Sequence, residues 1–490
     1  MKKTIYIITL AFATVLISGC SNLEDFGDTN LNPAATTTPI TSALLTNVLA
    51  GIDGYASNRT TALYCQYFSE TQYPDVSCYS LNQATPQGIY SGALYDLQNI
   101  IINNTDAATK AMAALNGTNE DQIAIARILK AYIYWTITDR WGDVPYSEAL
   151  KGNPNAVFDT QESIYKDLIK ELTEAVAQFT GAGAAIKGDI VFGGDLTKWK
   201  KTANSMRMLI ALRLSKQYPT SADYAATQFK AALSDAAGYI TSNADNFALK
   251  SPGGNFKNTF YNMYDGRKDY GESATMTSLM ATLNNDARQN VFGATVTGAA
   301  STLGVPYGRA RTYIDPWCGA NPTYCYVFAP SYRQQTSTTY VVTAAQVFLA
   351  RAEAADKGWT SETANTKVLY ESGITANYTQ WGLAAPSAAY LTHAAVALPS
   401  AFGTGANLSF IATQQYVAYW PDGTQGWSNW KRTNIPALLP APDATNSPKV
   451  IPRRFVYGTQ DYSLAKLATE AAAAAIPGGD KMDSKVWWDK

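Results

Sequence analysis

The side chains best suited to chemistry gather in two irregular, tyrosine-rich stretches, residues 64–95 and 245–335. An aromatic ring can cover the apolar C–H face of a sugar, while amide, carboxylate and guanidinium groups can bind the hydroxyl groups at its edge. Irregular stretches of this length inside a folded protein are usually functional or contain regular structure that the pattern misses, and we expect these two to form a ligand site. The candidate ligand-binding residues are Tyr73, Tyr79, Arg311, Tyr313, Trp317 and Tyr324.

Residues for catalysis are sparse. His393 is the single histidine of the chain, which argues against a Ser-His-Asp triad, a His/Cys nucleophile and a histidine-rich metal site. The sequence has no glycine-rich phosphate loop, and with 39 acidic residues a carboxylate pair can always be chosen. We therefore expect a binding protein without cofactor or metal rather than an enzyme. The enzymatic alternative is a secreted all-α glycosidase.

Four of the five cysteines lie as two local pairs in the sequence. These are Cys65 with Cys78 and Cys318 with Cys325. An oxidising compartment permits disulfides, and of the three possible connectivities we predict the local one. A zinc site is disfavoured because the spacing and the single histidine do not supply a ligand set. The second bridge would hold Trp317 and Tyr324 in one small loop, where Trp317 either faces a ligand or covers the disulfide.

The remaining cysteine, Cys20, ends a segment typical of a secretory signal peptide. A cationic start precedes an apolar run at residues 5–17, and small residues lead to the cysteine. The run is too short for a membrane span, and its junction with Cys20 resembles the lipobox of a bacterial lipoprotein. We predict a signal peptide at 1–19 and a lipid anchor with tether at 20–39, so that the lipid alone attaches the protein to a membrane.

The composition is that of a folded and nearly neutral protein. Loss of the signal peptide removes Lys2 and Lys3 and leaves 36 basic against 39 acidic residues, so nucleic acid is not expected as a partner. Charged residues make up 16% of the chain and aromatic residues 12%, which suits a neutral, hydroxyl-rich ligand. Because no linker composition interrupts the remainder, we predict one body over residues 40–490.

Helical periodicity dominates outside the two irregular stretches and must build the scaffold that positions them. The first predicted helix begins near Pro39. Four further helices are predicted over residues 121–141, 164–179, 199–214 and 341–355. Asp159 with Glu162 has the pattern of a capping box ahead of the helix at 164–179. At the C-terminus, Trp487 and Trp488 are expected to pack on the body.

Six sequence blocks resemble, in order, those of the SusD/RagB family of outer-membrane lipoproteins from Bacteroidetes. One of them is a helix that leads into a Gly-Asp-x-Pro turn, and another is a helix with the sequence Phe-Leu-Ala-Arg-Ala-Glu-Ala-Ala. The blocks lie at residues 126–146, at Trp199 with Ala203, Asn204, Arg207 and Arg213, at 348–358, at 370–374, at Gln415 with Trp427 and 430–433, and at 452–454 with 480–483.

The resemblance implies an all-α, mostly helical fold, with a tetratricopeptide-like scaffold of helix pairs and long irregular loop excursions. It also implies a lipoprotein that forms a lid on a SusC-like TonB-dependent outer-membrane transporter and delivers an oligomeric nutrient to it. That nutrient is expected to be an oligosaccharide or polysaccharide, or alternatively a peptide, as in RagB-like members. Glu24 and Asp25 resemble an acidic tag for export to the outer face of the outer membrane.

Overall fold

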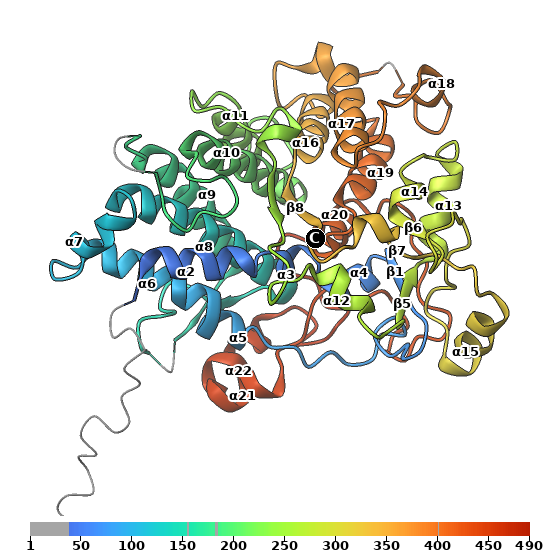
Figure 1. The fold of residues 1–490 in the computed structure, drawn as a ribbon, viewed down its shortest axis with the longest axis horizontal. Helices are drawn as coiled ribbons and strands as arrows, with labels where there is room; N and C mark the ends of the chain where they lie inside the picture. Colours follow the sequence, from blue (N-terminus) through green and yellow to red (C-terminus); the bar gives the residue numbers. More distant parts are fainter. Residues whose placement is uncertain (1–38, 154–155, 182–184, 400) are drawn as a thin grey trace, which may run out of the picture. The chain divides into compact units, whose positions relative to one another are not determined.

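Helices form where the sequence repeats apolar residues every three or four positions, and they make up most of the regular secondary structure (Figure 1). The computed structural model describes residues 39–153, 156–181, 185–399 and 401–490. Residues Thr41–Lys490 form one compact unit. The predicted signal peptide and the predicted lipid anchor at Cys20 lie outside the described residues, as does most of the predicted tether.

The predicted mostly helical class is confirmed. The helices of eight or more residues are α2 (Thr41–Ala50), α6 (Tyr95–Thr105), α8 (Asn119–Trp141), α9 (Gln161–Gln178), α10 (Leu196–Arg213), α11 (Tyr224–Leu233), α13 (Ala274–Thr282), α15 (Arg311–Ala320), α16 (Ala344–Asp356), α17 (Thr366–Gln380), α19 (Leu408–Tyr419), α20 (Gly423–Thr433) and α22 (Lys466–Ala475). Shorter ones are α3 (Asp53–Ala56), α4 (Arg59–Tyr64), α5 (Gln87–Ile89), α7 (Lys110–Ala113), α12 (Thr259–Tyr264), α14 (Gln289–Phe292), α18 (Ala388–Leu391) and α21 (Thr459–Leu464).

Side-chain caps set the ends of several scaffold helices. The Thr118 hydroxyl accepts a hydrogen bond from a backbone N–H in the first turn of α8, and Gly142, with a φ of 87°, ends that helix. At α16, Thr343 and Gln346 form a reciprocal capping box. Such local hydrogen bonds explain why these helices lie within a few residues of their predicted positions.

Two predicted boundaries are wrong. Thr160, not Asp159, caps α9, because Asp159 accepts hydrogen bonds from the backbone N–H groups of Tyr146 (3.1 Å) and Ser147 (2.8 Å). Val341 lies in strand β8 rather than in the following helix. In both cases a contact with another segment competes with the helical pattern.

Neighbouring helices pack on one another around a continuous apolar core. The pairs in contact include α6 with α8, α8 with α9, α9 with α10, α10 with α11, α16 with α17, α19 with α16 and with α20, and α4 with α20. Trp135, Trp199 and Trp427 are fully buried between them. None of the helices in the described part of the chain combines the length and the apolar character needed to cross a bilayer.

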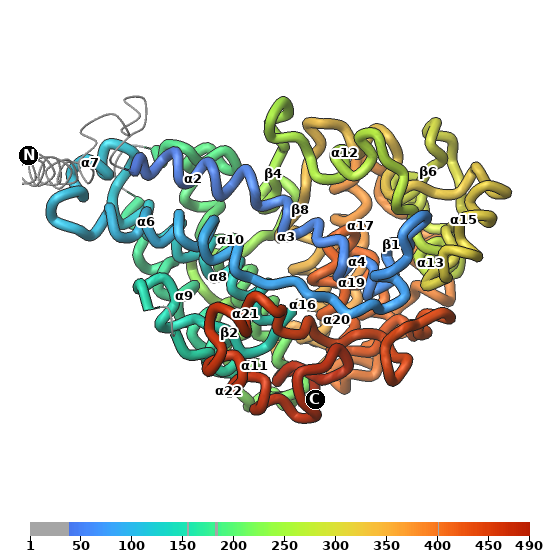
Figure 2. Tube along the Cα trace, turned by 90° about the horizontal axis from the view of Figure 1, so that it is seen from below, coloured from blue at the N-terminus to red at the C-terminus, as the bar shows by residue number. Residues whose placement is uncertain are grey.

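Short antiparallel strand pairs join segments that are distant in sequence. The pairs are β1 (Phe68–Glu70) with β5 (Tyr270–Glu272), β2 (Val144–Pro145) with β3 (Phe158–Asp159), β4 (Phe247–Lys250) with β8 (Thr338–Val342), and β6 (Gly293–Ala294) with β7 (Tyr326–Val327). Figures 1 and 2 both place β1, β6, α13 and α15 at the end of the body opposite α7. Residues 245–335, which were predicted to be irregular, contain α12–α15 and several strands.

The C-terminal tryptophans pack on the body as predicted. Trp488 is fully buried, and its indole N–H donates to Asp139 Oδ1 of α8 at 3.0 Å. Asp489 accepts hydrogen bonds from Lys216 Nζ (2.9 Å) and Arg453 Nε (2.6 Å). The last residues thus connect α8 with the segments that follow α10 and α20.

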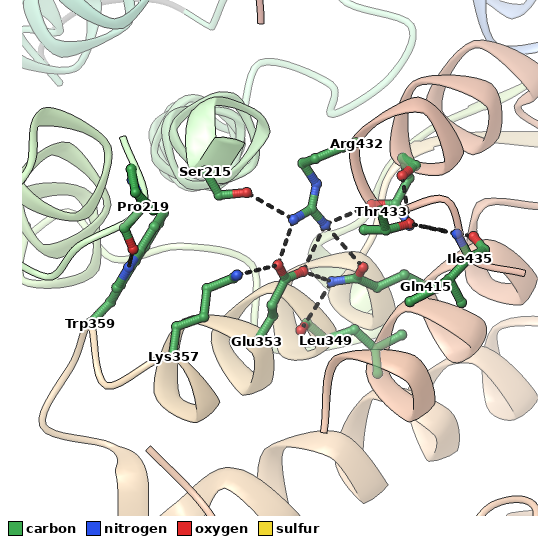
Figure 3. A network of polar contacts seen from close by, with 11 residues as sticks. Ser215, Pro219, Leu349, Glu353, Lys357, Trp359, Gln415, Arg432, Thr433 and Ile435 are labelled. Atoms are coloured by element: carbon green, nitrogen blue, oxygen red, sulfur yellow. Dashed lines mark hydrogen bonds and ion pairs between the residues drawn. The ribbon is translucent and has the colours of Figure 1, made fainter. Parts of the chain in front are cut away.

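A buried ion pair joins the C-terminal half of the scaffold (Figure 3). Arg432 of α20 donates from Nη2 to Glu353 Oε2 of α16 at 2.7 Å, and Gln415 of α19 donates to the same oxygen at 2.9 Å. Arg432 also donates to Ser215 Oγ, just after α10, at 3.0 Å. Burial alone would raise the pKa of Glu353, but the guanidinium outweighs it and holds that pKa below its usual range. Four chain segments therefore converge on one charge pair.

Arg432→Met removes the guanidinium and leaves the buried carboxylate of Glu353 with only the more distant ammonium of Lys357, at 3.8 Å. We expect the free energy of unfolding to fall by about 3–5 kcal/mol, measured by urea unfolding followed by circular dichroism. The control is Lys466→Met, which breaks an exposed 3.8 Å pair with Glu470. The control should change stability by no more than about 0.5 kcal/mol. Equal effects of the two substitutions would contradict the central role of the buried pair.

Candidate functional site

The pairing of β1 with β5 brings the two predicted stretches together. Phe68 pairs with Glu272 and Glu70 with Tyr270, so the turn after β1 lies beside the turn before β5. Thr71 continues the pairing, because its N–H donates to the carbonyl of Asp269 at 2.9 Å. Residues far apart in sequence thus face one cleft.

That cleft, called the candidate cleft below, has a volume of about 830 Å³. Its walls combine tyrosine rings with charged and amide side chains from both stretches. The lining residues are Gln72, Tyr73, Tyr261, Tyr264, Asp265, Gly266, Arg267, Lys268, Asp269, Val296, Tyr326, Pro330, Arg333 and Gln334.

A row of aromatic rings supports one side of the candidate cleft. Trp317 and Tyr324 have ring centroids 6.3 Å apart, Tyr324 stacks on Tyr326 at 5.0 Å with planes 7° apart, and Tyr326 lies 5.2 Å from Tyr264. The Tyr264 hydroxyl donates to the carbonyl of Tyr270 (3.0 Å) and accepts from the N–H of Val327 (2.8 Å). These bonds fix the ring of Tyr264, so the cleft wall is preorganised.

The carboxylates of the candidate cleft have cationic partners. Arg267 donates from Nε to Asp269 at 2.6 Å, and Lys257 lies 3.3 Å from Asp265. The guanidinium of Arg333 instead stacks on two rings, with centroid distances of 4.4 Å to Tyr264 and 5.4 Å to Tyr326. Burial lowers the pKa of Arg333 although the two rings oppose that effect.

Five of the six predicted ligand-binding residues lie at the candidate cleft or on the elements beside it. Tyr73 lines it and is 52% exposed, and the Arg311 guanidinium lies 5.2 Å from the centre of its ring. Tyr313, 42% exposed, and the half-buried Trp317 lie one helical turn apart on α15. Tyr324 is buried in the aromatic row and supports the wall.

The prediction for Tyr79 is corrected by its burial. Tyr79 is 1% exposed, its ring packs on Tyr64 and Tyr307, and its hydroxyl accepts from the N–H of Ala441 at 3.0 Å. The backbone of Tyr79 has a φ of 64°, which is uncommon for a residue other than glycine. Tyr79 therefore belongs to the core and not to the candidate site.

The two predicted disulfides are also wrong, because all four cysteines in the described part of the chain are free thiols. The sulfurs of Cys65, Cys318 and Cys325 each contact a different segment. Cys65 Sγ lies 3.9 Å from the carbonyl of Gly423, and Cys78 lies beside Thr445, which donates its N–H to the Cys78 carbonyl. Cys318 Sγ is 3.9 Å from Thr71 O, and Cys325 Sγ donates to Ser301 O at 3.1 Å. Local spacing in the sequence did not reveal these partners.

The residues that sequence reasoning missed belong to residues 261–269 and to the segment around Arg333. The first has a visible signal, since Tyr261, Tyr264 and a run of charges follow one another closely. Arg333 has no such signal, because its role depends on stacking against rings from α12 and β7. A single arginine among polar residues is otherwise unremarkable in sequence.

Two buried carboxyls lie on the paired strands that bring the two predicted stretches together. Glu70 of β1 accepts from the N–H and hydroxyl of Ser77, which orders the turn after Tyr73, and burial raises the pKa of Glu70 to about 7. Glu272 of β5 accepts from Gln289 Nε2 at 2.6 Å, and burial raises its pKa to about 8. A Cβ at Gly293 would lie 1.9 Å from Glu272, so glycine is required there.

The sequence matches the SusD-like family model, described as starch-binding and associating with the outer membrane, over residues 32–458. The chain belongs to the SusD-like family. The resemblance seen in the sequence blocks is thereby confirmed. Among proteins of curated function, no sequence matches the chain.

Solved structures share this SusD-like fold. One is a chitin-binding protein with 27% identity and a TM-score of 0.75, covering 92% of this chain and 99% of that one. A second is a chitin-binding SusD homolog from Flavobacterium johnsoniae (22% identity, TM-score 0.76, 92% and 98% covered). A third is a SusD homolog from Bacteroides uniformis (22% identity, TM-score 0.74, 92% and 99% covered).

Glu272→Gln tests the protonation of the buried carboxyl under the candidate cleft. The folded chain holds a proton up to about pH 8 that the unfolded chain releases near pH 4.5. Stability from the protonated carboxyl is therefore complete below about pH 4.5 and is lost as pH rises through about 8. We expect the stability of the variant relative to wild type to increase across this range by roughly 5 kcal/mol.

The measurement is the melting temperature and unfolding free energy of both proteins as a function of pH. Glu470→Gln, at an exposed position on α22, controls for the general effect of this substitution. A constant difference between Glu272→Gln and wild type across the range would contradict protonation of Glu272 in the folded protein.

Proposed function

We propose that this SusD-like protein is a lipid-anchored outer-membrane protein that binds an oligosaccharide at the cell surface and delivers it to a SusC-like TonB-dependent transporter. The observation that carries the proposal is the candidate cleft, where tyrosine rings and polar side chains from two distant stretches meet. A ligand with apolar faces and hydroxyl edges matches that combination.

Within the cleft, the exposed ring of Tyr73 offers a stacking surface for a sugar. The ion pair of Arg267 and Asp269 offers donors and acceptors to hydroxyl groups, and the amide of Gln334 offers both. Trp317 and Tyr313 on α15 extend the aromatic surface beyond the cleft. Several modest contacts along an oligomer suit capture followed by release.

Binding rather than catalysis fits the carboxylates of the cleft. Asp265 and Asp269 each lie in an ion pair, whereas hydrolysis of a glycoside requires one carboxyl that donates a proton to the leaving oxygen. The chitin-binding proteins of similar fold support a carbohydrate as ligand. The packed pairs α8/α9, α10/α11 and α16/α17 support the tetratricopeptide-like arrangement that the sequence resemblance implies.

Tyr73→Ala should weaken binding of an oligosaccharide by about five- to thirtyfold, because an aromatic stacking surface is lost. Isothermal titration with the oligosaccharide that binds wild type most tightly, chosen from neutral and acidic glycans, measures the affinity, and thermal melting checks the fold. Tyr95→Ala is the matched control, since Tyr95 on α6 is also 52% exposed and lies outside the candidate cleft.

Trp317→Ala, tested in the same way, reports whether the ligand extends to α15. Unchanged affinity in both Tyr73→Ala and Trp317→Ala, with unchanged melting, would place the ligand elsewhere on the protein. Binding of peptides in place of any glycan would overturn the proposed ligand class.

Cys20→Ala removes the proposed site of lipidation. We expect this variant to move from the membrane fraction to the soluble fraction, because no other membrane attachment is proposed. Fractionation followed by immunoblotting measures the distribution, and Ser21→Ala is the control. Retention of Cys20→Ala in the membrane fraction would contradict the lipid anchor.

A further inference from the structure

Arg333 is a buried cation without a counter-charge. It is 9% exposed, follows Pro330–Tyr332 and lines the candidate cleft. In the described part of the chain, no carboxylate pairs with its guanidinium and no acceptor takes a hydrogen bond from it. Its contacts are the faces of Tyr264 and Tyr326.

The other buried arginines in the described part of the chain have an anionic partner or, in the case of Arg140, a hydrogen-bond acceptor, the Thr136 carbonyl at 2.8 Å. Arg288 pairs with Asp286, Arg432 with Glu353, and Arg454 with Asp480. Burying a guanidinium is unfavourable unless an anion or acceptors compensate, and ring faces compensate only in part. Arg333 therefore has no anionic or hydrogen-bonding partner in the described part of the chain, and its donors face the candidate cleft.

The surroundings of the guanidinium determine where such a partner can bind. Its central carbon lies over the rings of Tyr264 and Tyr326, and none of its nitrogen atoms is among the fully buried polar atoms without a partner. The N–H donors are thus accessible from the candidate cleft that Arg333 lines. A planar carboxylate, or the oxygens of a sulfate ester, can accept two of these N–H groups at once.

The other charges of the candidate cleft do not supply that partner. Asp269 is held by Arg267, and Asp265 is held by Lys257. Lys268 also lines the cleft and has no ion-pair partner in the described part of the chain. The charges within these two ion pairs cancel. The two charged side chains of the cleft that have no ion pair, Arg333 and Lys268, are both cations.

We propose that the candidate cleft selects an acidic glycan, with Arg333 binding an anionic oxygen group, a uronate carboxylate or a sulfate ester, on one sugar unit. This inference rests on the proposed oligosaccharide-binding function and specifies its ligand class. Lys268 adds a longer-range attraction for the same charge. Neutral glycans lack the group that completes the site.

The experiment compares binding of acidic glycans (polygalacturonate, alginate, hyaluronate, chondroitin sulfate) with neutral ones (starch, xylan, dextran, chitin oligomers) by affinity electrophoresis and titration. We expect an acidic glycan to bind, and Arg333→Gln to weaken that binding by about ten- to a hundredfold. Binding should also weaken with added salt, because charge attraction is screened. Methyl-esterified and desulfated forms of the glycan that binds identify whether a carboxylate or a sulfate is recognised.

Arg351→Gln is the matched control. Arg351 also stacks on a tyrosine, Tyr239 at 5.1 Å, but it pairs with Glu362 and lies outside the candidate cleft. The Arg351→Gln substitution should leave glycan binding unchanged. Should Arg333→Gln fail to fold, as judged by circular dichroism, the exposed Lys268→Gln serves in its place, with an expected loss of about two- to fivefold.

Three results would overturn the proposal. Binding of neutral glycans alone would refute the acidic ligand but leave the proposed function intact. Binding of an acidic glycan with equal affinity by wild type and a folded Arg333→Gln would remove Arg333 from recognition. Absence of binding to every glycan of both groups would refute the proposed function together with this inference.

Discussion

The buried ion pair between Arg432 and Glu353 is the interaction on which the arrangement of the scaffold depends. A guanidinium and a carboxylate inside an apolar core are stable only when each has its partner and its remaining hydrogen bonds are satisfied. Here Gln415, Ser215 and Asn429 complete the set. Helices α16, α19 and α20 and the end of α10 can therefore adopt only a packing that brings all of these groups together (Figure 3). Apolar packing alone would allow the helices to slide along one another.

This constraint extends to the candidate cleft through α19 and α20. Tyr416, next to Gln415, donates its hydroxyl to the carbonyl of Cys65 at 2.7 Å, and Tyr67 donates its hydroxyl to the carbonyl of Tyr416. Gly426 of α20 leaves the space that the Tyr67 ring occupies, since a Cβ there would lie 2.4 Å from its hydroxyl. Strand β1 begins at Phe68, directly after Tyr67, and pairs with β5. The position of the cleft wall thus follows from the packing of helices that do not line it.

A feature of this protein could be predicted from the sequence when the interactions that produce it are local along the chain. Scaffold helices such as α8 and α10 follow from apolar periodicity, which is local, and their predicted extents are close to the observed ones. The pairing of Phe68 with Glu272 could not be predicted, because the two strands lie far apart in sequence and are only three residues long. Tyr73 and Tyr79 look equivalent in the sequence, yet contacts with residues far away in the chain hold the Tyr79 ring in the core. The types of side chain in the candidate site could therefore be predicted from the sequence, but the particular residues could not.

The charge of the candidate cleft likewise depends on contacts that the sequence does not reveal. Few charges and many tyrosines over the whole chain suggest a neutral ligand, but composition averages over every surface and cannot report which charges are paired. Within the candidate cleft, Arg267 and Asp269 neutralise each other, whereas Arg333 meets only rings. A ligand responds to the unpaired charge in the cleft and not to the net charge of the protein. One arginine left without a counter-charge in a low-dielectric wall can therefore set specificity on a protein that is nearly neutral as a whole.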